Sequence, residues 1–150
     1  MLTTADLYQL FANNRGIQDV SIHFDTVSIF DNGDLKKGLF VPIDNEHRLD
    51  KAIESGAIAA IWPSEKEVPF FTPNHFPIFL VENPISAFKQ LCDHYIYKIK
   101  QEECEKMTKF VFFSPELLKN HPQTYDLSEK GTGQQLLETI NNFMNKDGRG

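Results

Sequence analysis

The sequence predicts an α/β fold in which a small mixed or mostly parallel sheet is flanked by helices. Residues 31–61 carry this prediction. A short apolar run at Leu39–Val41 is followed by an amphipathic segment at Leu49–Glu54, a stop at Gly56 and a second apolar run at Ile58–Trp62. A parallel pair of strands needs a crossover of about a dozen residues, and the helix of that crossover covers one face of the sheet. We therefore expect a βαβ unit here.

The residues before this unit predict one helix and one or two strands. Thr3 or Thr4 is a suitable N-cap, and the apolar residues that follow recur at helical spacing as far as about Asn13. Residues Val20–Phe24 alternate between polar and apolar, and Val27–Phe30 do so weakly. This period of two is typical of strands, and we expect a bend between the two segments.

The residues after the βαβ unit predict a surface loop, a strand and a long helix. Residues 64–77 contain three prolines, which favour a loop wrapped over the domain. Ile78–Val81 is a short apolar run that suits a buried strand. Asn83 and Pro84 are a favourable N-cap and first residue for a helix whose apolar positions continue to about Lys100.

We expect two parts in the chain. Residues 1–103 should form the α/β domain, and residues 104–150 a C-terminal extension that packs on it. Within the extension, Lys109–Phe113 reads as a strand, which either leads into another domain or joins the same sheet. Gln134–Met144 shows apolar residues on one helical face. The sequence therefore predicts an extension made of a strand and a helix.

The composition excludes several classes of protein. Of the 150 residues, 21 are acidic and 15 are Lys or Arg, which gives a net charge of -6 and argues against a nucleic-acid-binding surface. No apolar run approaches the roughly 18 residues that a membrane span needs. The first residues lack a signal-peptide pattern. Cys92 and Cys104 are too few for a disulfide scaffold, and we expect them to be reduced in a cytoplasmic protein.

The sequence predicts neither a cofactor nor a metal site. The segment Lys130–Gln135 contains two glycines, but Gln134 and Gln135 stand where a phosphate-binding loop has Lys and a hydroxyl residue. We interpret it as a turn that leads into a helix. Cys92 and His94 are two residues apart on one predicted helix and point to different sides, so they cannot share a metal ion.

Five short motifs occur in one order along the chain: Asp31-Asn32-Gly33, Lys37–Pro42, Asn45–Leu49, Ser55–Ala60 and Val81–Phe88. Their order and spacing resemble the amino-terminal, UDP-sugar-binding domain of the Mur ligases, the ATP-dependent enzymes that add amino acids to muramoyl peptides. The resemblance covers about residues 17–98 and implies the same α/β fold.

The resemblance also implies a set of ligand-binding residues. In the family, the first motif and the loop before the helix contact the uracil and the diphosphate. The matching positions are Asn32, Gly33, Asn45, His47 and Arg48. Gly33 stands where the family has Arg, and Arg48 is the cation that can compensate for this loss. An alternative is that Asn32-Gly33 is only a tight turn.

Two functions follow as hypotheses. The first is a module that binds a UDP-linked muramoyl peptide or a related nucleotide in bacterial cell-wall (peptidoglycan) metabolism, without ligase activity of its own, because the ATP-binding phosphate loop is missing. The second is a protein–protein interaction or regulatory module that kept the fold and lost the nucleotide. Phe70, Phe71 and Phe76 would then contact a partner or a second copy, unless they cover the protein's own core. A third reading is a split enzyme completed by a separate chain.

Overall fold

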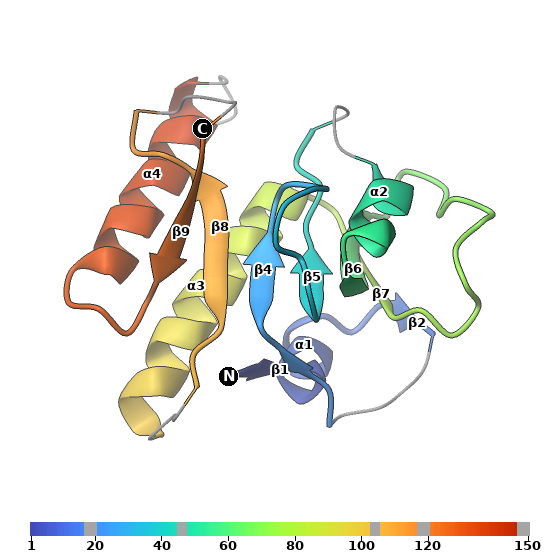
Figure 1. Ribbon diagram of the computed structural model, residues 1–150, viewed down its shortest axis with the longest axis horizontal. Coiled ribbons are helices and arrows are strands. Elements are labelled where there is room, and N and C mark those ends of the chain that lie inside the picture. The colour runs from blue at the N-terminus through green and yellow to red at the C-terminus, as the bar shows by residue number, and fades with distance from the viewer. Residues whose placement is uncertain (17–20, 45–47, 103–105, 117–120, 147–150) are drawn as a thin grey trace.

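The computed structural model describes residues 1–16, 21–44, 48–102, 106–116 and 121–146 and confirms the predicted α/β class (Figure 1). Its main sheet has the strand order β2-β7-β6-β5-β4-β8-β9, and a separate small sheet pairs β1 with β3. The strands are β1 (Leu2–Thr3), β2 (Asn14–Arg15), β3 (His23–Phe24), β4 (Thr26–Ser28), β5 (Gly38–Phe40), β6 (Ala57–Pro63), β7 (Ile78–Val81), β8 (Lys109–Phe113) and β9 (Pro122–Asp126). The helices are α1 (Thr4–Leu10), α2 (Leu49–Glu54), α3 (Pro84–Gln101) and α4 (Thr132–Lys146).

The middle of the sheet is parallel and its two edges are antiparallel. Strands β7, β6, β5, β4 and β8 run in one direction, whereas β2 and β9 pair antiparallel with β7 and β8. The predicted βαβ unit is present as β5-α2-β6. Strand β8 joins the same sheet beside β4, which decides between the two alternatives for Lys109–Phe113.

One strand was not predicted. The extension contains a second strand, β9, which the sequence did not reveal because Pro122–Asp126 has a single large apolar residue, Tyr125. Before the βαβ unit, the predicted bend is present between β3 and β4, and it separates two sheets because β3 pairs with β1. Residues 17–20, which include the start of the predicted Val20–Phe24 strand, lie outside the described residues.

The helix ends follow from local chemistry. Thr3 caps α1, and the Asp6 carboxylate accepts the Thr3 backbone N–H in return, which makes a capping box. The Asn83 side chain accepts the Ile85 N–H at the start of α3. After α2 the chain turns at Gly56 with φ of +114°, where a Cβ atom would lie 2.8 Å from the Lys36 Cα. Only glycine fits this position without strain.

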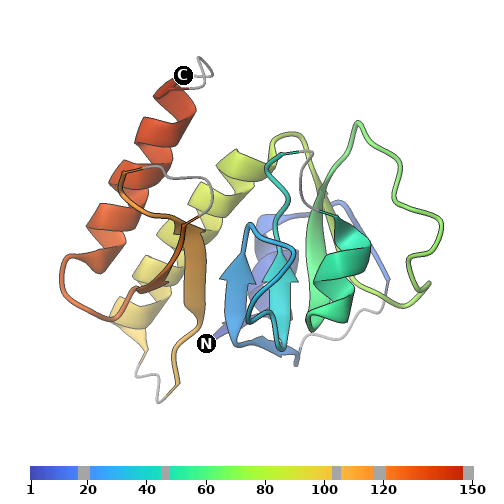
Figure 2. The same cartoon turned by 45° about the horizontal axis from the view of Figure 1, so that its top comes forward.

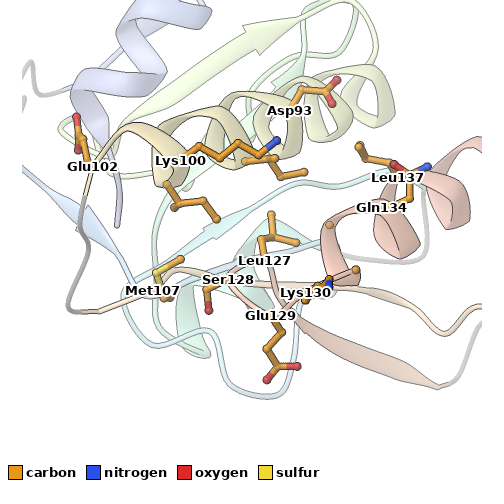
Figure 3. A pocket seen from close by; sticks show the side chains of 14 residues that line it. Asp93, Lys100, Glu102, Met107, Leu127, Ser128, Glu129, Lys130, Gln134 and Leu137 are labelled. Atoms are coloured by element: carbon orange, nitrogen blue, oxygen red, sulfur yellow. The ribbon is translucent and has the colours of Figure 1, made fainter.

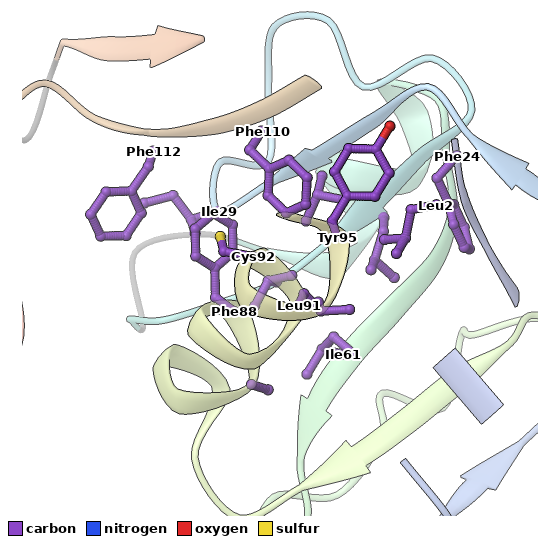
Figure 4. Close-up of a cluster of buried hydrophobic side chains, with 14 of the residues drawn as sticks. Leu2, Phe24, Ile29, Ile61, Phe88, Leu91, Cys92, Tyr95, Phe110 and Phe112 are labelled. Carbon is purple, nitrogen blue, oxygen red and sulfur yellow. The ribbon is translucent and has the colours of Figure 1, made fainter. Parts of the chain in front are cut away.

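The helices cover the two faces of the sheet unequally. Figure 2 shows α2 in front of the sheet and α1 and α3 behind it, with α4 next to β9. The larger core lies on the α1–α3 face, where Phe88 packs against Phe112 and Tyr95 against Phe110 (Figure 4). A smaller core lies under α2 and includes Phe40, which is fully buried.

The loop of residues 64–77 carries its three phenylalanines in two different environments. Phe76 is 7% exposed and belongs to the core under α2, so at this position the alternative that the ring covers the protein's own core is confirmed. Phe70 is fully exposed and Phe71 is 47% exposed. The loop therefore covers the protein's own core near its C-terminal end and presents two aromatic rings to solvent in its middle.

Among the described helices, none is both long and apolar enough to span a membrane.

Candidate functional site at the carboxyl edge of the sheet

The strand order changes direction between β4 and β8. From β4 the chain adds β5, β6 and β7 on one side, and then returns through α3 to place β8 on the other side of β4. In Figure 1 the loop after β4 crosses the front of the sheet, whereas α3 crosses behind it. Ligands of open α/β sheets bind outside the carboxyl ends of the strands at such a switch point. This edge is therefore the candidate site.

The first motif lies at this switch point, immediately after β4. The Asp31 side chain is buried, and its Oδ2 accepts the backbone N–H of Arg48 at 2.8 Å. The Asp31 carbonyl oxygen accepts the Ser55 hydroxyl at 3.0 Å. These two bonds join the loop after β4 to both ends of α2. They bring the first motif and the loop before the helix together, although the two are 17 residues apart in the chain.

Arg48 is the N-cap residue of α2, but its side chain makes no capping hydrogen bond. Its backbone N–H is instead accepted by the Asp31 carboxylate from the loop after β4. Asp31 is the first residue of the first motif, and the structure adds this contact with the start of α2. The order of the motifs in the sequence indicated that the segments of Asp31 and Arg48 belong to one site. The hydrogen bond between them depends on how β4 and α2 are placed in the fold.

The Arg48 guanidinium forms an ion pair with the Asp50 carboxylate. Its Nε and Nη2 donate to the two carboxylate oxygens of Asp50 at 3.0 and 2.7 Å. The side chains are 63% and 35% exposed. Ion pairs exposed to this degree contribute about 0.2–1 kcal/mol, so a phosphate can compete with Asp50 for the guanidinium.

Asn32 and Gly33 form an exposed turn beside this pair. Gly33 has φ of +82°, and a Cβ atom built on it would meet no heavy atom within 4 Å. The backbone conformation, not a lack of space, thus favours glycine at this position. Asn32 is exposed. The other two predicted ligand residues, Asn45 and His47, lie outside the described residues.

Strand β8 brings a buried hydroxyl to the same switch point, which sequence reasoning did not single out. The rings of Phe30 and Phe113 are 5.6 Å apart, so the residues that follow them, Asp31 and Ser114, begin the two loops of the switch. Ser114 is 9% exposed, and its Oγ has no hydrogen-bond partner in the described part of the protein. A buried hydroxyl without a partner requires an explanation, such as a bound ligand or water.

A cleft of about 450 Å³ opens farther along the same edge, at the carboxyl ends of β5, β6 and β7. Its charged lining residues are Asp44, Glu65, Lys66 and Glu82. Three carboxylates against one ammonium group do not suit a diphosphate. The half-buried Trp62 offers an aromatic face, and its indole N–H donates to the Glu67 carbonyl at 3.2 Å. The cleft suits neutral groups that carry hydroxyls or amides.

A second polar cluster joins α1 to α3, far from this edge. His94 Nε2 and Lys98 Nζ lie 3.0 and 2.8 Å from the two carboxylate oxygens of Asp6. Burial raises the pKa of Asp6, but the hydrogen bonds from Lys98 and His94 together lower it by more. The pKa of Asp6 is therefore below its ordinary value. Lys98 Nζ also donates to the Met1 carbonyl at 2.9 Å. The cluster fastens the first helix to the long helix.

The Lys98 side chain is only 16% exposed, so it does not belong to the solvated surface of α3, although the lysines and glutamates around it in the sequence are typical of such a surface. His94 and Lys98 are four residues apart and share a helix face, which was a usable signal. Their partner Asp6 is 92 residues from Lys98, and no local pattern reveals it.

Two further observations concern reactive groups. Cys92 is buried, and burial raises the pKa of its thiol well above the ordinary value, so it is not a nucleophile at neutral pH. Cys104 lies outside the described residues. Within the described ranges, no group of three or more His, Cys, Asp or Glu residues has a geometry that suits a metal ion.

Comparison with models of known protein families gives no match, and no curated protein matches the chain.

Proposed function

We propose that the protein is a cytoplasmic module that binds a UDP-linked muramoyl peptide, or a related nucleotide sugar, at the carboxyl edge of its sheet. In this proposal it serves cell-wall metabolism by binding and does not itself catalyse ligation. One observation carries the proposal: the hydrogen bond from the Arg48 N–H to Asp31 Oδ2 brings the two resembling segments together beside the switch point.

The side chains at the switch point suit the parts of such a ligand. A guanidinium pairs with a diphosphate through two parallel N–H···O bonds, which is the role proposed for Arg48. The Asn32 amide has both a donor and an acceptor, as does the imide edge of uracil. The Ser114 hydroxyl, which has no hydrogen-bond partner among the described residues, adds a buried hydrogen-bonding group at the same place.

The acidic cleft has a separate role in this proposal. Its charge excludes the diphosphate, so the sugar and the peptide amides would lie there, with the sugar ring against Trp62. Ligand pockets of about 300–1,000 Å³ hold molecules of this class, and the cleft of about 450 Å³ holds one part of it.

The test is a calorimetric titration of the protein with UDP and with UDP-N-acetylmuramic acid. We expect a dissociation constant at or below about 100 µM, which corresponds to roughly 5.5 kcal/mol of binding. Arg48→Ala should weaken binding, and Asp50→Asn should strengthen it, because the guanidinium is then released from its partner. Arg15→Ala, which removes an exposed cation on β2, is the matched control.

Opposite effects of Arg48→Ala and Asp50→Asn are the decisive result, because a purely structural role of the ion pair makes both variants change binding in the same direction. If neither ligand gives saturable heat at about 1 mM, a concentration that detects binding of about 4 kcal/mol, the proposal fails.

A second function is favoured by one specific observation, the exposed pair Phe70 and Phe71. Their ring centroids are 6.3 Å apart, and Phe70 is fully exposed. Two adjacent aromatic rings in water are typical of a protein contact surface. In sedimentation velocity, self-association that is lost in Phe70→Ser but kept in Tyr97→Ser, an exposed aromatic on α3, would support this function.

A further inference from the structure

We draw no further inference here: the strongest candidate, the apolar groove of about 950 Å³ between α3 and α4 (Figure 3), carries none, because three carboxylates and two ammonium groups line it together and nothing in the structure shows what covers it.

Discussion

The two halves of the main sheet bury their strands in different ways. In β6, five of the seven residues are buried and the other two are half-buried, because α2 covers one face and α3 the other. In β8, Phe110 and Phe112 are buried against α3, whereas on the other side Lys109 is exposed, Val111 is half-buried and only Phe113, at the end of the strand, is buried. The half that contains β5, β6 and β7 is a three-layer structure, and the half that contains β8 and β9 has two layers.

The difference shows what strand direction does to burial. Parallel strands are joined by crossovers that cover both faces, whereas an antiparallel hairpin needs a core on one face only. On the open face of the hairpin, Lys109 Nζ and Asp126 Oδ2 are 2.7 Å apart. On its other face, Tyr125 donates its hydroxyl to the Phe113 carbonyl at 2.7 Å. Tolerance to substitution should therefore differ between adjacent residues of β8 and be uniformly low in β6.

The largest effect is expected on the covered face of the hairpin. Phe110→Ala removes a fully buried ring that contacts Phe88 and Tyr95 and should lower the free energy of unfolding by about 3–5 kcal/mol. Urea denaturation measures the change, with Val111→Ala on the open face as the control. Equal losses for these two neighbours would show that the open face is covered after all.

A smaller loss is expected for the ionic cluster that joins α1 to α3. Asp6→Asn leaves the Lys98 ammonium group without its carboxylate and should cost about 1.5–3 kcal/mol, the range for hydrogen bonds to charged groups. The folded-state pKa of Asp6 is below its ordinary value. Its stabilising effect is therefore present above the unfolded-state pKa of about 4 and is lost as the pH falls through the folded-state pKa.

Acid denaturation checks the sign of this effect. The wild-type protein should lose more stability than Asp6→Asn when the pH is lowered from neutral through about 4. Parallel losses in the two proteins would mean that Asp6 is not held as a carboxylate by Lys98 and His94.

Substitutions that enlarge a side chain compare the face of β6 that lies under α2 with the open face of β8. Ala60→Leu, in β6 under α2, adds atoms to a filled core and should cost about 1–3 kcal/mol. Val111→Leu enlarges a side chain on the open face of β8 and should change stability by less than about 0.5 kcal/mol. Thermal unfolding of the two variants measures both, and similar costs would contradict the three-layer and two-layer description.

The smallest effect is expected for the exposed ion pair of the hairpin. Asp126→Asn removes the carboxylate that faces Lys109 and should cost less than about 1 kcal/mol, because water screens this pair. The hydrogen bonds from Lys109 and Ser128 hold the pKa of Asp126 below its ordinary value, so the small loss should disappear in acid. A loss as large as that of Asp6→Asn, measured by urea denaturation at neutral pH, would refute the contrast between the two clusters.

The sequence revealed most in the three-layer half. Leu49–Glu54 and Ile78–Val81 were predicted with the bounds that the structure has, because buried strands and a short amphipathic helix leave continuous apolar patterns. The strand β9 was missed, because an edge strand with one covered face needs few apolar residues. Of the candidate site, the positions of Asn32, Gly33 and Arg48 after β4 and before α2 followed from the order of motifs.

What the sequence determined by itself is local: the caps at Thr3 and Asn83, the glycine turn at Gly56 and the periodicity that separates helices from strands. These depend on interactions between residues that are near in the chain. What only the tertiary structure decided is the place of β8 beside β4, the tie between Asp31 and Arg48, the cluster of Asp6 with Lys98, and the groove between α3 and α4. These contacts join distant segments, and their geometry depends on how whole layers pack, which no local pattern encodes.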